Sequence, residues 1–144
     1  MRHQALTLYW DSSAVISVLF PDSHHEQAAE WAHRSAIHVI STLAWAEVHS
    51  VISRLQCECG IAAALVDAAR SAQERDPWTR LQDPPDWNIL RALALRWPLP
   101  GADLWHLALA KTLQQERPEL RLLSFDDRLS KAAAGEGLAA TTST

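Results

Sequence analysis

The stretch that decides the fold class is Leu6-Thr-Leu-Tyr-Trp-Asp-Ser-Ser13, in which a short apolar run ends directly in an acidic residue and two hydroxyl residues. The apolar part predicts a buried strand from Leu6 to Trp10, and the pattern after it predicts a helix from Ser13 that Pro21 stops. The chain repeats this succession of strand, polar turn and helix further on. Alternating strands and helices imply crossover connections and a mostly parallel sheet, so we expect an α/β fold.

The other elements follow from apolar periodicity and from the positions of glycine and proline. Further strands are predicted at His38–Ser41, Thr79–Gln82, Leu120–Phe125 and Leu138–Thr141, and further helices at Ser23–Ser35, Thr42–Glu58, Ile61–Glu74, Asp86–Trp97, Ala102–Glu116 and Asp127–Ala134. We therefore expect one domain over residues 1–144, with a central sheet of about four or five strands flanked by helices.

Composition sets limits without naming a function. The chain has 144 residues, of which 48% are hydrophobic, enough for one domain with a substantial core. No apolar run approaches the roughly 18 residues that a membrane span needs, so a soluble cytoplasmic protein is the simplest interpretation. The net charge of −4 and the excess of arginine over lysine do not decide for or against a nucleic-acid partner.

Four acidic residues fall where predicted strands give way to helices. Asp11 and Asp126 follow apolar strands, Asp103 opens a helix, and Glu47 lies about one turn into another. Parallel strands share one carboxyl edge, where ligands of α/β sheets bind. Carboxylates gathered there would repel one another unless a cation lay between them, and Mg²⁺ or Mn²⁺ prefers oxygen ligands. The pattern therefore indicates metal-assisted chemistry on phosphate esters.

Each of these residues also has a plain structural interpretation. Asp11, Asp103 or a serine such as Ser12 or Ser13 could cap a helix, and Glu47 could lie on a solvent-facing side. A serine beside Asp11 could equally add an oxygen ligand or hold the carboxylate. The signals are weak one at a time and much stronger through their joint placement.

Several neighbours are candidates for supporting roles. His106 lies one turn after Asp103 and could face the crevice or simply pack in the core. Asp127 is expected to cap the last helix, which leaves Asp126 for the metal. Arg128 and Lys131 follow on that helix and could hold a phosphate backbone, or form an ordinary solvated face.

With these residues in hand, the chain resembles the PIN-domain ribonucleases of the VapC toxin type. The resemblance extends from residue 8 to about residue 141. The stretches that carry it are Leu8–Val15, Ser41–Val48, Ala102–Ala108 and Leu123–Leu129, in the family's order and spacing. A tryptophan at position 105 departs from the family, where a smaller side chain is usual, and Trp105 could stack on a base or restrict entry.

The resemblance implies both an activity and a set of site residues. The family's acidic quartet falls on Asp11, Glu47, Asp103 and Asp126, its hydroxyl residue falls on Ser12, and the neighbour that caps the helix falls on Ser13. The implied activity is an endoribonuclease that needs Mg²⁺ or Mn²⁺ and lets an activated water attack the phosphodiester in line. Such a protein would be a homodimer held inactive by a cognate antitoxin, whose C-terminal segment fills the active-site groove.

Two other classes of function stay open at this point. One is a catalytically idle PIN-like module that binds RNA or a protein, which the complete acidic quartet disfavours. The other is a different metal-dependent phosphoesterase. An aspartyl-phosphate phosphatase usually has a second Asp two residues after its nucleophile, and that position here is Ser13. The sequence does not indicate which RNA would be cut.

Overall fold

A four-stranded parallel sheet forms the centre of the protein. The computed structural model describes residues 5–60, 62–75 and 77–141. The strands lie in the order β3-β2-β1-β4, and each neighbouring pair is parallel. They are β1 (Thr7–Trp10), β2 (Ile37–Ser41), β3 (Trp78–Leu81) and β4 (Leu120–Leu123). The α/β class predicted from the sequence is confirmed.

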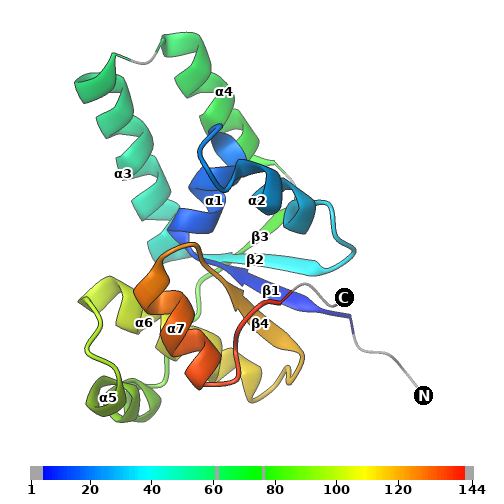
Figure 1. The fold of residues 1–144 in the computed structure, drawn as a ribbon, viewed down its shortest axis with the longest axis vertical. Helices are drawn as coiled ribbons and strands as arrows, with labels where there is room; N and C mark the ends of the chain where they lie inside the picture. The colour runs from blue at the N-terminus through cyan, green and yellow to red at the C-terminus, as the bar shows by residue number, and fades with distance from the viewer. Residues whose placement is uncertain (1–4, 61, 76, 142–144) are drawn as a thin grey trace.

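Seven helices in the described part of the chain cover the two faces of this sheet (Figure 1). On one face lie α1 (Ser12–Leu19), α2 (His25–Ala32), α3 (Thr42–Cys59) and α4 (Ala63–Glu74), and on the other lie α5 (Trp87–Arg96), α6 (Gly101–Gln114) and α7 (Asp127–Gly135). Among the described residues, no helix combines the length and apolar character that crossing a membrane requires.

Strand β1 supplies both hydrophobic cores because its side chains alternate between the two faces. Leu8 and Trp10 pack with α1, α2, α3 and α4, whereas Tyr9 packs with α5, α6 and α7. All three side chains are fully buried. A strand that is covered on both faces reads as a continuous apolar run, which is the pattern seen from Leu6 to Trp10.

The last strand expected from the sequence does not form as a strand. In place of a strand at Leu138–Thr141 there is one isolated parallel bridge, between Leu122 and Ala139. The backbone N–H of Leu138 donates to the carbonyl of Ala133 in α7, at 2.8 Å, so it is already used by the end of that helix. Gly137, with φ of 73°, makes this tight return possible. The sheet therefore has four strands, the lower end of the predicted range.

Strand register brings the turns of several crossovers to the same edge. Trp10 lies opposite both Ile40 of β2 and Leu123 of β4, so these three strands end at one level. The N–H of Asp11 continues the pairing and donates to the carbonyl of Leu123 at 3.2 Å. Residues just beyond these positions, at the starts of α1, α3 and α7, thus lie side by side.

Candidate active site

The acidic residues predicted from the sequence all belong to this carboxyl edge. Asp11 precedes α1 and Asp126 precedes α7 as their N-cap residues, while Asp103 lies in the first turn of α6. Glu47 lies further along α3, in its second turn. Asp11 is almost fully buried, at 3% exposure, and the other three side chains are partly exposed.

The Ser13 hydroxyl forms hydrogen bonds that hold the Asp11 side chain and connect the turn after β1 with the turn after β4. The Oδ1 atom of Asp11 accepts hydrogen bonds from the Ala14 N–H at 2.8 Å and from the Ser13 hydroxyl at 2.7 Å. The Ser13 oxygen in turn accepts from the N–H of Phe125, after β4, at 3.0 Å. The expectation that Ser13 caps the helix is wrong, because Asp11 is the cap. Ser12 is the first, half-buried residue of α1.

Asp126, not Asp127, caps α7. Its Oδ1 atom accepts from the N–H of Leu129 at 3.0 Å, and its own N–H donates to the hydroxyl of Ser124 at 3.0 Å. The backbone of Asp126 is extended, as an N-cap requires, whereas Asp127 is already the first helical residue and is exposed. The prediction that Asp127 is the cap is therefore wrong.

His106 is buried between two polar partners at this edge. Its Nδ1 atom lies 2.7 Å from the hydroxyl of Tyr9, and its Nε2 atom lies 2.6 Å from Oε1 of Glu47. The ring is only 1% exposed. The histidine is therefore packed in the core, and it also contacts Glu47, one of the four acidic residues.

The pKa values of two of these carboxyl groups, Asp11 and Asp103, are raised. Burial raises the pKa of Asp11, and hydrogen bonds from Ser124, Ala14 and Ser13 offset part of that rise. Burial also raises the pKa of Asp103, which the negative charges of Asp126 and Asp11 raise further. The charge of Asp103 therefore interacts with the charges of Asp126 and Asp11 across the edge.

A divalent cation fits this donor set by charge and by chemistry. Mg²⁺ and Mn²⁺ bind hard oxygen ligands, and Asp11, Asp103, Asp126 and Glu47 offer only such atoms. Among the described residues no three His, Cys, Asp or Glu side chains are already arranged as a ligand set. Mg²⁺ usually keeps several waters and takes one or two carboxylates directly, so it does not need a closed protein cage.

A shallow hollow lies beside Asp103. It has a volume of about 520 Å³ and is lined by residues of the first turns of α3 and α6, namely Thr42, Leu43, Gly101, Ala102 and Trp105. The half-buried indole of Trp105 therefore lines a depression together with Gly101 and Ala102, which precede Asp103 in α6. Arg128 and Lys131 lie on α7 three residues apart and are both exposed.

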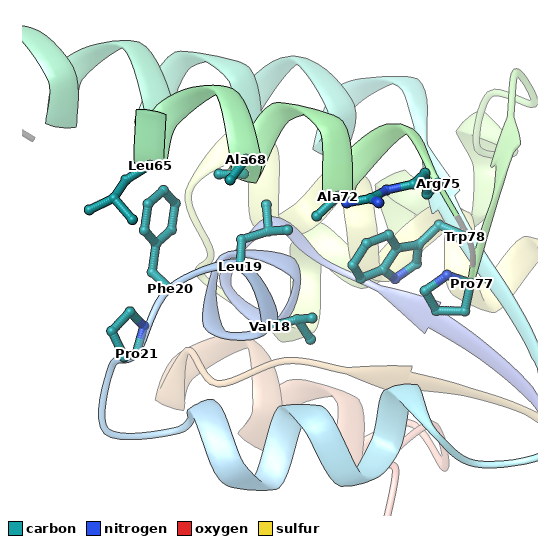
Figure 2. Close-up of a pocket in the computed structure, with 11 residues that line it drawn as sticks. Val18, Leu19, Phe20, Pro21, Leu65, Ala68, Ala72, Arg75, Pro77 and Trp78 are labelled. Atoms are coloured by element: carbon teal, nitrogen blue, oxygen red, sulfur yellow. The ribbon is translucent and has the colours of Figure 1, made fainter. Parts of the chain in front are cut away.

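A larger groove lies elsewhere, at the far end of α1 (Figure 2). Its volume is about 660 Å³, and its walls are the end of α1 with the residues after it, one side of α4, and Trp78 of β3. Among the described lining residues Arg75 is the one with an ionisable side chain. The eight residues of α1 separate it from Asp11 by roughly 12 Å. An apolar groove of this kind is unsuited to hold a cation or a phosphate ester.

Three of these features escape a reading of the sequence alone. The hydrogen bond between Tyr9 and His106 joins residues 97 positions apart, and the contacts of Ser13 with Ser124 and with the N–H of Phe125 depend on strand register. One signal was available. A tyrosine inside a buried strand needs a hydrogen-bond partner for its hydroxyl. Tyr9 lies two residues before Asp11, so that partner could be expected near the carboxyl edge.

The fold and the site together define a class: a parallel α/β sheet with an acidic site, suited to a divalent cation, at the carboxyl edge of its strands. The family model of the PIN domain matches residues 8–135, so the chain belongs to the PIN-domain family. A comparison with functionally curated proteins finds no match.

Two solved structures share the fold. One is VapC20 of Mycobacterium tuberculosis, described as a sarcin-ricin loop cleaving toxin, with a TM-score of 0.59 and 15% identity over 87% of this chain and 94% of that one. The other is PAE2754 of Pyrobaculum aerophilum, with a TM-score of 0.56 and 19% identity over 90% of this chain and 86% of that one. At these identities the likeness concerns the fold.

Charge crowding predicts how stability depends on pH when no metal is bound. A raised carboxyl pKa contributes stability that is complete below the ordinary value of about 3.9 and is lost as pH rises through the raised value. Asp103→Asn removes that loss, because asparagine stays neutral. We expect the variant to melt at a higher temperature than the wild type at neutral pH in chelator, with the difference shrinking on acidification.

Thermal unfolding followed by circular dichroism across the acidic range measures this difference. Asp127→Asn is the matched control, because Asp127 is exposed and outside the cluster, and it should bring no such gain. An Asp103→Asn difference that is independent of pH would show that the raised pKa of Asp103 has no weight in folding.

Proposed function

We propose that this protein is an endoribonuclease that depends on Mg²⁺ or Mn²⁺ and acts as the toxin of a toxin–antitoxin pair. One observation carries the proposal. Asp11, Glu47, Asp103 and Asp126 gather at the carboxyl edge of a PIN-domain sheet, where burial and then the charges of Asp126 and Asp11 raise the pKa of Asp103. The description of VapC20 as a toxin that cleaves the sarcin-ricin loop supports RNA as the substrate class.

The side chains would divide the work between holding charge and holding position. Asp11, Asp103, Asp126 and Glu47 would bind the cation, and Ser13 keeps Asp11 and the turn before Asp126 in register. When bound, a divalent cation supplies a polarised phosphate oxygen and a water of lowered pKa. An attacking water would take the place of a protein nucleophile, so this hydrolysis would need no activated serine or cysteine.

The substrate would lie across the mouth of this edge. We propose that the indole of Trp105 stacks on a base next to the scissile phosphate, in the hollow beside Asp103. Arg128 and Lys131 present their charges on one exposed side of α7 and would contact the phosphate backbone. Single-stranded or looped RNA suits such contacts, because its bases are free to stack.

The proposal also includes protein partners and a compartment. A toxin of this type would act in the cytoplasm, where its RNA substrate is found. It would form a homodimer and be held inactive by an antitoxin segment that fills the acidic groove. Light scattering of the purified chain, alone and with a candidate antitoxin, tests both associations.

The first prediction concerns RNA cleavage. Purified protein free of partners should cut total cellular RNA into discrete products with Mg²⁺ or Mn²⁺ and should be inactive in chelator. Asp103→Ala should reduce the rate by at least about 100-fold, because it removes a cation ligand at the reacting centre. Gel electrophoresis and mapping of the fragment ends measure this.

A matched pair of variants tests whether cleavage requires the negative charges of the acidic cluster in particular. Asp126→Asn retains an oxygen that can cap α7 but removes a negative charge from the cluster. Asp127→Asn removes the negative charge of the next residue, which lies outside the cluster. We expect only the first to lose activity. If folded wild-type protein cleaves nothing with either metal, the idle binding module becomes the better interpretation. Release of phosphate from a simple aryl ester would favour another phosphoesterase.

A second prediction separates base stacking from charge. Trp105→Ala should raise KM for RNA roughly 5- to 150-fold, the equivalent of about 1–3 kcal/mol of stacking, while Trp105→Phe should keep most of the affinity. Arg128→Ala and Lys131→Ala should instead each reduce the salt dependence of RNA affinity by about one charge. Equal KM values for Trp105→Ala and wild type would remove Trp105 from the substrate path.

A further inference from the structure

A chain of short hydrogen bonds runs from the core of the sheet to one acidic residue of the site. Glu47 Oε1 lies 2.6 Å from Nε2 of His106, and Nδ1 of the same ring lies 2.7 Å from the hydroxyl of Tyr9. A carboxylate can only accept, so Nε2 carries the proton that it donates. The other ring nitrogen of a neutral histidine then accepts the Tyr9 proton. The two partners thus determine which ring nitrogen of His106 donates a hydrogen bond and which accepts one.

These bonds join the two helical layers at the site. Tyr9 belongs to the core beneath α5, α6 and α7, and His106 is one of the buried residues of α6. Glu47 belongs to α3, whose apolar side chains pack on the opposite face of the sheet. The contact between His106 and Glu47 therefore crosses from one layer to the other at the carboxyl edge, where Asp11 and Asp103 also lie.

Glu47 needs such a contact more than its neighbours do. Asp11 and Asp126 are held by their own helices, since each accepts a backbone N–H as an N-cap. Glu47 lies in the second turn of α3, has a longer side chain, and is 29% exposed. Its carboxylate accepts a hydrogen bond from His106. Because that bond uses Oε1, Oε2 is left for a cation.

We propose that His106, oriented by Tyr9, is a positioning residue that holds Glu47 in the geometry for binding the divalent cation. This inference rests on the proposed function. In metal sites, partners that orient a ligand typically contribute 10- to 100-fold to metal affinity. The two residues act through Glu47, and neither touches the substrate.

The chain offers a matched control in His38. It too is buried and has two hydrogen bonds, from the Trp10 indole to its Nδ1 and from its Nε2 to the carbonyl of Arg34, each 3.0 Å long. His38 contacts none of the four acidic residues through these bonds. His38→Leu therefore removes a buried bridging histidine without touching Glu47, and it reports what a purely structural histidine contributes.

The experiment measures Mn²⁺ affinity in the absence of RNA, from the electron paramagnetic resonance signal of free Mn²⁺. The full chain and its variants are compared at a temperature where circular dichroism shows each to be folded. We expect His106→Leu to weaken Mn²⁺ binding 10- to 100-fold. His106→Gln, whose amide can donate to Glu47, should recover most of the affinity, and Tyr9→Phe should lose several-fold. His38→Leu should bind as the wild type does.

Unchanged affinity in His106→Leu would overturn the proposal, and so would equal losses in His106→Leu and His106→Gln, because the donated hydrogen bond would then be irrelevant. If His106→Leu does not fold, Tyr9→Phe decides, and wild-type affinity in that variant overturns the proposal. A wild-type protein that binds no Mn²⁺ would contradict the metal-dependent function itself, a result distinct from both.

Discussion

Repulsion among carboxylates at one edge of a parallel sheet is the constraint on which the site depends. Every strand pair described is parallel, so the turns after β1, β2 and β4 leave the sheet at the same edge. The sequence places Asp11 and Asp126 in two of these turns, and Asp103 in the first turn of α6 faces the same charges. Burial raises the pKa of Asp11, and burial together with the charges of Asp126 and Asp11 raises that of Asp103. A divalent cation would relieve this crowding of charge.

The fold stabilises this crowding locally. Asp11 and Asp126 each cap a helix, so the positive potential of a helix N-terminus partly compensates each charge. The capping and metal-binding interpretations of these aspartates are therefore compatible, because Asp11 caps through Oδ1 alone. Ser13 adds a mechanical link, since its hydroxyl contacts both Asp11 and the backbone after β4. One small side chain thus keeps two acidic turns at a fixed separation.

Local signals predicted most of the fold and the membership of the acidic set. The apolar run before Asp11 predicted β1, and the strand–turn–helix succession predicted the parallel sheet. The predicted ends of two elements were wrong where short-range hydrogen bonds of the backbone set a different boundary. Leu138 bonds to α7 and does not extend a fifth strand, and Asp126 takes the cap expected of Asp127.

The contacts that organise the site depend on tertiary structure and could not be read from local pattern. The hydrogen bonds from Tyr9 through His106 to Glu47 join β1 to one helix on each face of the sheet. The spacing of these residues in the sequence does not predict them. The hollow beside Trp105 likewise exists because the first turns of α3 and α6 meet. Residue identity is the basis of the chemistry proposed for the site, and the register of the sheet determines its geometry.

Thermal unfolding with and without Mg²⁺ tests the shared cation site most directly. The melting temperature of the wild type should rise with Mg²⁺ according to RT ln(1 + [L]/Kd), which reaches about 2.7 kcal/mol at one hundred times Kd. Asp11→Asn, which retains an oxygen to cap α1, should start from a higher metal-free melting temperature and gain less from Mg²⁺. A wild type that gains nothing at saturating Mg²⁺ or Mn²⁺ would contradict the account.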